Sequence, residues 1–195
     1  MSLDAMLVFE FGLGVAALLI GWFFDFDPLR TIPRGTAVLS TNLKHIALGA
    51  ALALPLLVFF LTLEVSLPEL FRPIRDALDE ALAPTLCEAG WAGRALVSLG
   101  AGIGEELLFR GLIQDGLGQL WGSPLLALLA ASVLFGAVHW LNTTYFLFAT
   151  GMGLVFGALW IWTGSLVAPI VMHAVYDMLA LESLMRDYNR RKQGQ

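Results

Sequence analysis

The sequence is poor in charge. Of its 195 residues, 14% are Asp, Glu, Lys or Arg and 58% are hydrophobic, whereas soluble domains are about 25% charged. It has no basic patch, which argues against a nucleic-acid partner. Its one cysteine, Cys87, excludes an intrachain disulfide. With a mean hydropathy of +0.77, these scarcities predict an integral membrane protein whose apolar surface faces a lipid bilayer.

Apolar runs recur along the chain, each near the 17–25 residues or so that cross a bilayer. We expect six spans, at 5–24, 46–63, 93–113, 124–141, 146–163 and 165–185. The first run has no Lys or Arg before it and no convincing cleavage site, so we expect a retained span and not a signal peptide. The predicted fold class is all-α, a polytopic transmembrane helix bundle.

The loop at 64–92 contains an amphipathic stretch. Apolar residues recur at helical spacing between Pro68 and Pro84, and charged residues fill the opposite face. This pattern is typical of a helix lying in the membrane interface. A surface helix packed on the bundle is the alternative.

The distribution of Lys and Arg predicts the orientation in the membrane. With a cytoplasmic N-terminus, the inner side holds seven basic residues; with the N-terminus outside, it holds three. The seven are Arg72, Arg75, Arg94, Arg186, Arg190, Arg191 and Lys192, and the three are Arg30, Arg34 and Lys44. We therefore expect both termini in the cytoplasm.

The third predicted span contains two carboxylates and a guanidinium, which are costly in hydrocarbon and mark functional sites (about 2.5–3.5 kcal/mol for a central Arg, Lys or Asp). Glu106 and Arg110 are four residues apart and lie on one face of an ideal helix. Glu105 points about 140° away from Arg110. We therefore expect Arg110 to pair with Glu106, which leaves Glu105 to act as a general base.

Two later spans carry histidines. His139 follows Phe135 by one helical turn, so the phenyl ring can pack on the imidazole. His173 and Asp177 are also one turn apart, so the carboxylate can orient that imidazole. Because these groups lie in separate spans, we expect Glu105, His139 and His173 to converge on one cavity.

Other polar residues carry weaker signals. We interpret Glu10 and His45 as structural or interfacial. Ser132, Thr163 and Ser165 lack a basic partner in the sequence, which disfavours a serine protease, and no HExxH is present. The GxxxG pairs that permit close helix contacts are Gly100/Gly104 and Gly153/Gly157.

In order along the chain, the three spans read Glu-Glu-x-x-x-Arg, Phe-x-x-x-His and His-x-x-x-Asp. Over about 101–180, this ordered trio resembles the CPBP family (CAAX proteases and bacteriocin-processing enzymes, also called Abi), whose best-known members are the type 2 CAAX prenyl endopeptidases. Asp177 stands where the eukaryotic members carry Asn. The catalytic set that the resemblance implies is Glu105, Glu106, Arg110, His139, His173 and Asp177.

The resemblance also implies roles for these residues. Glu105 and His139 would activate the attacking water. His173 and Asp177 would stabilise the oxyanion, and Glu106 with Arg110 would support the site. Two histidines and a glutamate could also hold zinc, but we favour water activation without metal.

The predicted function is therefore an intramembrane endopeptidase that cuts a membrane-associated protein or peptide. Prenylated substrates are implied for the eukaryotic relatives. For this compact chain we expect a prokaryotic cytoplasmic membrane and a peptide, leader or membrane-anchored protein as substrate. We divide the chain into N-terminal spans with the amphipathic loop at 1–92, a catalytic membrane core at 93–185 and a basic tail at 186–195.

Two other functions compete with this prediction. A non-catalytic protein for bacteriocin immunity or scaffolding would use the polar trio only to hold helices together, but that role does not explain an unpaired Glu105. A proton-coupled transporter would usually show inverted repeats or broken helices, and the sequence shows neither.

Overall fold

The computed structural model describes residues 1–34 and 38–194, and within these ranges the chain is helical and contains no strand. The α-helices are α1 (Leu3–Phe23), α2 (Val38–Ser66), α3 (Pro68–Ala81), α4 (Ala83–Glu106), α5 (Asp115–Trp121), α6 (Pro124–Val138), α7 (Thr143–Thr163) and α8 (Val167–Lys192). A π-helix, η1 (Leu107–Gln114), joins α4 to α5. The all-α bundle predicted from the sequence is confirmed.

Among the described residues, four helices are long and apolar enough to cross a membrane: α1, α2, α7 and α8. They correspond to the first, second, fifth and sixth predicted spans. The third predicted span lies in the continuous run formed by α4 and η1, and α6 is a shorter apolar helix of 15 residues. Large apolar side chains on these helices are exposed, as expected of a surface that faces lipid. The chain is therefore an integral membrane protein.

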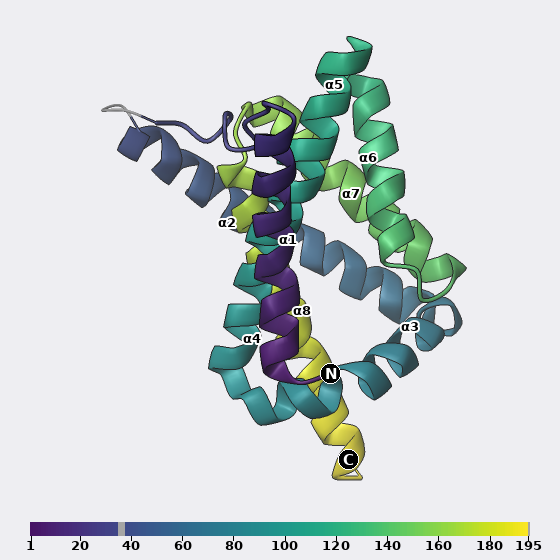
Figure 1. The fold of residues 1–195 in the computed structure, drawn as a ribbon. Helices are drawn as coiled ribbons and strands as arrows, with labels where there is room; N and C mark the ends of the chain where they lie inside the picture. Colours follow the sequence, from purple (N-terminus) through teal and green to yellow (C-terminus); the bar gives the residue numbers. More distant parts are fainter. Residues whose placement is uncertain (35–37, 195) are drawn as a thin grey trace.

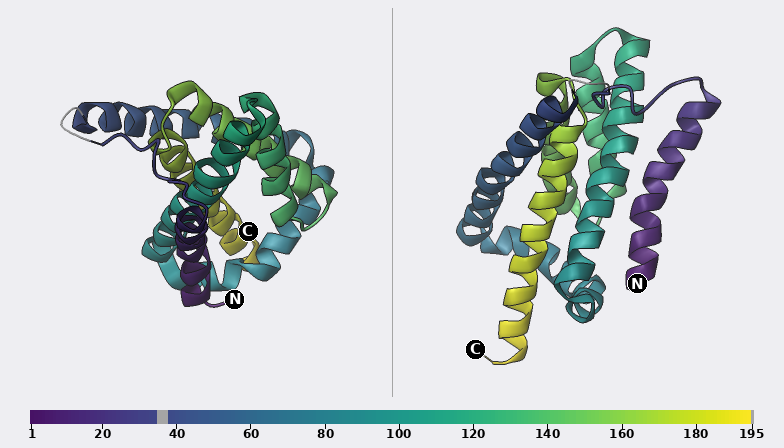
Figure 2. Two further views of the ribbon diagram at one scale, coloured as in Figure 1. Left: turned by 45° about the horizontal axis from the view of Figure 1, so that its top comes forward. Right: turned by 90° about the vertical axis from the view of Figure 1, so that its left-hand side faces the viewer.

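The long helices run between two ends of the molecule (Figure 1), and both termini lie at the same end. Helix α8 packs against both α2 and α4, α1 packs against α4, and α6 and α7 form an antiparallel pair. Figure 2 shows α1 and α2 on opposite sides of the α4–α8 pair. The end of α4 is thus enclosed by neighbouring helices.

Glycines allow the closest of these contacts. A Cβ on Gly104 would lie 1.9 Å from the backbone oxygen of Glu10, and one on Gly100 would lie 3.0 Å from the Glu10 Cβ. Only hydrogen side chains permit α1 and α4 to approach this closely. The second predicted pair, Gly153 and Gly157, likewise allows α7 to pack closely against α6 and η1.

The amphipathic stretch forms helix α3, as predicted, but it is packed on the bundle. Ile74 is buried, and two ion pairs fix the helix at its sides. Arg75 pairs with Glu64 of α2, and Asp79 pairs with Arg191 of α8. This arrangement corresponds to the packed surface helix that the sequence left as an alternative.

Three features of the backbone were not predicted. Helix α4 is interrupted at Gly90, whose φ of 63° is in the left-handed region that favours glycine. The segment at 107–114 is a π-helix and not the regular α-helix assumed from the sequence. Finally, Arg30 in the α1–α2 linker pairs with the buried Asp115 of α5. The hydrogen bonds that its guanidinium donates to this carboxylate raise the pKa of Arg30.

Candidate active site

Two adjacent carboxylates end helix α4 inside the protein. Glu105 is 5% exposed and Glu106 is fully buried, as is Arg110 in η1. Arg110 Nη1 lies 3.1 Å from Glu106 Oε1, and Nη2 donates to the backbone oxygen of Gly153 at 3.0 Å. The predicted Glu106–Arg110 pair is therefore confirmed. Within the described ranges, no ion pair joins Glu105 to Arg110.

Aromatic rings surround the buried guanidinium. The Arg110 Cζ lies 4.6 Å from the centroid of the Phe135 ring and 5.6 Å from that of Phe156. Ring faces attract cations, most strongly where water is excluded. Arg110 thus connects η1 to α6 and α7 as well as neutralising Glu106.

Glu106 has a second role, because it also contacts His173. Its Oε1 lies 2.9 Å from His173 Nδ1, whereas Asp177 Oδ2 lies 3.4 Å from His173 Nε2. The sequence predicted that Asp177 would orient the His173 imidazole, and its contact at Nε2 agrees with that prediction. Glu106 on the neighbouring helix is an additional partner, at Nδ1. Spacing along one helix cannot reveal such a partner.

His173 therefore has an acceptor beside each ring nitrogen. A ring with protons on both nitrogens would donate to Glu106 on one side and to Asp177 on the other. The ring of Phe156 stacks on the imidazole with centroids 4.6 Å apart. These contacts fix the ring so that its Nε2 faces the site.

His139 is held differently. It caps the C-terminus of α6, and its Nδ1 lies 2.7 Å from the backbone oxygen of Phe135. A carbonyl oxygen can only accept, so Nδ1 carries a proton; in the neutral form of the ring the lone pair is therefore on Nε2. The Phe135 ring packs on the imidazole with centroids 4.5 Å apart, as predicted from their spacing.

The two predicted histidines, His139 and His173, converge on Glu105. Its Oε2 lies 3.6 Å from His139 Nε2 and 4.0 Å from His173 Nε2, and it has no hydrogen bond from any described residue. The Glu105 carboxylate and the His139 lone pair are both acceptors, so neither can satisfy the other. A water molecule between them could donate one proton to each. These residues and Asp177 line a cavity of about 90 Å³.

Zinc is the metal that these donor types would suit, so we compared their separations with those of a zinc site. Ligands of tetrahedral zinc, with bonds of about 2.0–2.1 Å, lie about 3.3 Å apart. The separations of 3.6 Å and 4.0 Å around Glu105 Oε2 are wider. In the part of the chain that the structure describes, no three His, Cys, Asp or Glu residues are arranged to hold a metal. As placed, the residues do not fit zinc.

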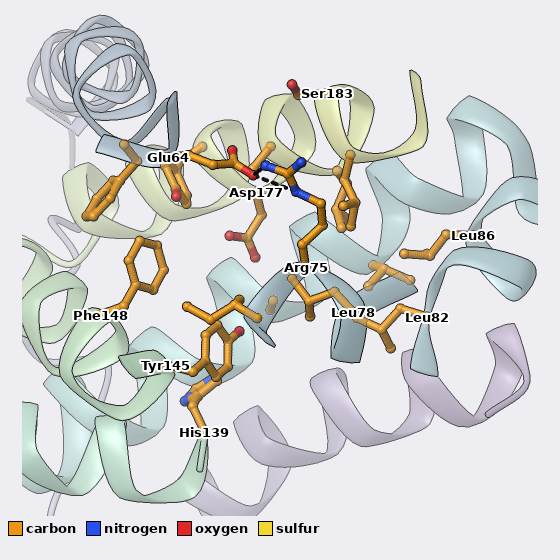
Figure 3. Close-up of a pocket in the computed structure, with 18 of the residues that line it drawn as sticks. Glu64, Arg75, Leu78, Leu82, Leu86, His139, Tyr145, Phe148, Asp177 and Ser183 are labelled. Atoms are coloured by element: carbon orange, nitrogen blue, oxygen red, sulfur yellow. Dashed lines mark hydrogen bonds and ion pairs between the residues drawn. The ribbon is translucent and has the colours of Figure 1, made fainter. Parts of the chain in front are cut away.

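The small cavity adjoins a chamber of about 350 Å³ (Figure 3), which Glu105, His139 and Asp177 also line. Its walls are mostly apolar side chains of α2, α3, α4 and α8. Figure 3 shows the Glu64–Arg75 ion pair crossing one side of this chamber, with Asp177 pointing into it. The candidate catalytic groups therefore face a partly open pocket with mostly apolar walls.

The sequence interpretation missed two residues at this chamber. Glu10, judged structural or interfacial, lines the chamber from α1, and Tyr145 of α7 lines both cavities. An ionisable residue within the first apolar run was itself a signal of function. The disfavoured hydroxyls are engaged elsewhere: Ser132 and Thr163 donate to backbone oxygens, and the Ser165 oxygen accepts from the Val167 backbone N–H.

Fold and site together define a helical membrane protein that encloses acid/base groups beside an apolar chamber. Comparison with known proteins is more specific. Residues 88–179 match the family described as type II CAAX prenyl endopeptidase Rce1-like. This segment contains all six predicted site residues, and the match confirms the family resemblance predicted from the three motifs.

A relative in Bacillus subtilis (strain 168), the uncharacterized protein YpbD, is 31% identical over 93 residues. The aligned region covers 45% of this chain and 43% of YpbD, so the chain spans less than half the length of this relative. No solved structure matches the chain.

Proposed function

We propose that the protein is an intramembrane endopeptidase of the CAAX protease type, acting on a membrane-associated protein or peptide. One observation carries this proposal: Glu105 Oε2 and His139 Nε2 lie 3.6 Å apart at the same cavity, and in the neutral form of His139 both atoms are acceptors. A water held by both would be oriented and polarised for attack. The match of residues 88–179 to the Rce1-like family supports the same chemistry.

In the proposed reaction, the water oxygen attacks the carbonyl carbon of the scissile peptide bond while Glu105 accepts a proton from the water. His139 holds the other water hydrogen and so directs the oxygen lone pair. His173 Nε2–H, with Glu106 behind it at Nδ1, donates to the oxyanion of the tetrahedral intermediate. Glu105 then returns its proton to the leaving amine, and the C–N bond breaks.

Arg110 acts through Glu106 and does not touch the substrate. Its charge compensates the buried Glu106 carboxylate, which in turn fixes the His173 ring. We propose residues 93–185 as the catalytic core, with α1 and α3 closing the chamber against it. No step in this scheme uses a metal.

Purified protein in proteoliposomes tests the proposal. Membrane proteins and peptides incubated with it should acquire new termini, read by mass spectrometry. Glu105→Gln should abolish these products, because the amide cannot accept the proton, while leaving the protein inserted and folded. His139→Ala should act similarly. Glu88→Gln, on the same helix but outside the site, is the matched control and should cleave normally.

Undiminished cleavage by Glu105→Gln would refute the general-base role. Cellular effects of the protein that persist through every one of these substitutions would instead support the non-catalytic immunity or scaffold function.

A further inference from the structure

Glu10 of α1 lies beside the site although it is far from the other site residues in sequence and outside the family match. The close approach of α1 to α4 at Gly100 and Gly104 fixes the position of Glu10. A Cβ added to Gly104 would fall 1.9 Å from the Glu10 backbone oxygen. Gly104 directly precedes Glu105. The Glu10 side chain lines the same chamber as Glu105, His139 and Asp177.

The Glu10 carboxylate has no partner from the protein. Its Oε2 is buried and receives no hydrogen bond, and no ion pair within 1–34 and 38–194 includes Glu10. Burying a carboxylate without a donor is costly. Glu105, which is 5% exposed, also directs an oxygen without a hydrogen bond toward this space. Both of these carboxylates that line the chamber thus have an oxygen without a hydrogen-bond donor in the described part of the chain.

The charges around the chamber indicate which donor fits. Carboxylates outnumber basic groups there: Glu10, Glu64, Glu105, Asp177 and Asp187 line it, against Arg75 and His139. Asp187 already has Arg190 beside it. Arg75 is already paired with Glu64. The remaining wall is apolar, and in a medium of low dielectric an uncompensated negative charge attracts a cation strongly.

We propose that Glu10 is a specificity-determining residue that binds the cationic side chain of a Lys or Arg in an otherwise apolar substrate segment. This inference rests on the proposed endopeptidase function. The chamber, about 350 Å³, is at the small end of ligand pockets, which range over about 300–1,000 Å³. It therefore holds only a few side chains, and the basic residue lies close to the peptide bond that is cut.

Paired peptides test this assignment in proteoliposomes. One peptide carries Lys near the scissile bond within an apolar sequence, and the other carries norleucine at the same position. The cleavage site is first located with a peptide library that was generated by a protease that does not cut at Lys or Arg. Glu10→Gln should lower kcat/KM for the Lys peptide by about 10- to 100-fold, the value of a hydrogen bond to a charged group. Cleavage of the norleucine peptide should not change. Asp4→Asn, on the same helix but outside the chamber, should alter neither rate.

Glu10→Lys extends the test, because it should reverse the preference toward an Asp peptide. An equal fall for both peptides with Glu10→Gln would show a structural role and overturn the proposal. Unchanged rates for both would show that Glu10 holds its own proton and binds nothing.

A binding assay separates this proposal from the proposed function. Fluorescent Lys and norleucine peptides are titrated against Glu105→Gln protein, with and without Glu10→Gln. Tighter binding of the Lys peptide only where Glu10 is retained would support the inference even if the wild-type protein cut neither peptide. Equal binding of both peptides in both proteins would refute it.

Discussion

Removing the guanidinium of Arg110 should destabilise the protein more than any other single change in the site. The side chain is 1% exposed, lies 3.1 Å from Glu106 and donates to the Gly153 backbone oxygen. Breaking a buried ion pair by deleting one partner costs about 3–5 kcal/mol, because the other charge is left without compensation. Arg110→Met, which roughly keeps the volume between Phe135 and Phe156, should therefore lose about this much unfolding free energy.

Unfolding in detergent, followed by tryptophan fluorescence, measures this loss. The double variant Arg110→Met with Glu106→Gln is the decisive comparison, because it removes both charges. It should recover much of the lost stability yet cleave slowly, since Glu106 no longer presents a charged oxygen to His173 Nδ1. If Arg110→Met alone were as stable as the wild type, the assignment of a buried charged pair would be refuted.

Two further predictions address the helix contact and the metal. Gly104→Ala should disrupt the α1–α4 contact, because its Cβ would meet the Glu10 backbone oxygen at 1.9 Å. Overpacking costs about 1–3 kcal/mol or more, so the thermal unfolding temperature should fall. Gly151→Ala, where a Cβ meets nothing within 4 Å, should leave that temperature unchanged. Elemental analysis of active, chelator-washed protein should find no stoichiometric zinc. Zinc whose removal and return switched activity off and on would contradict the metal-free mechanism.

The sequence predicted those parts of the site that depend on spacing within one helix. A spacing of four positions, from Glu106 to Arg110 and from Phe135 to His139, places each pair on one helix face, and both contacts are present. The apolar periodicity between Pro68 and Pro84 likewise predicted α3. The energetic cost of ionisable groups in apolar spans explains the rest of this success, because such groups are rare there and mark functional sites.

Contacts between helices could not be predicted in the same way. No spacing reveals that Glu106 reaches the His173 Nδ1, since 67 residues separate them. The position of Glu10 beside the chamber could not be predicted for the same reason, because α4 packs against it. The π-helix at 107–114 adds a residue to the turn after the Glu-Glu pair, which ideal helical geometry does not foresee.

Helix α6 has only 15 residues, so it is about 22 Å long at 1.5 Å per residue. A bilayer has a hydrocarbon core of about 30 Å. The membrane must therefore thin beside α6, or the turn that carries His139 must sit below the headgroups. Either response costs a fraction of a kcal/mol per ångström of mismatch. Lipid thickness thus acts directly on the depth of the His139 imidazole. Under the proposed function, the composition of the host membrane would be a physical control on cleavage.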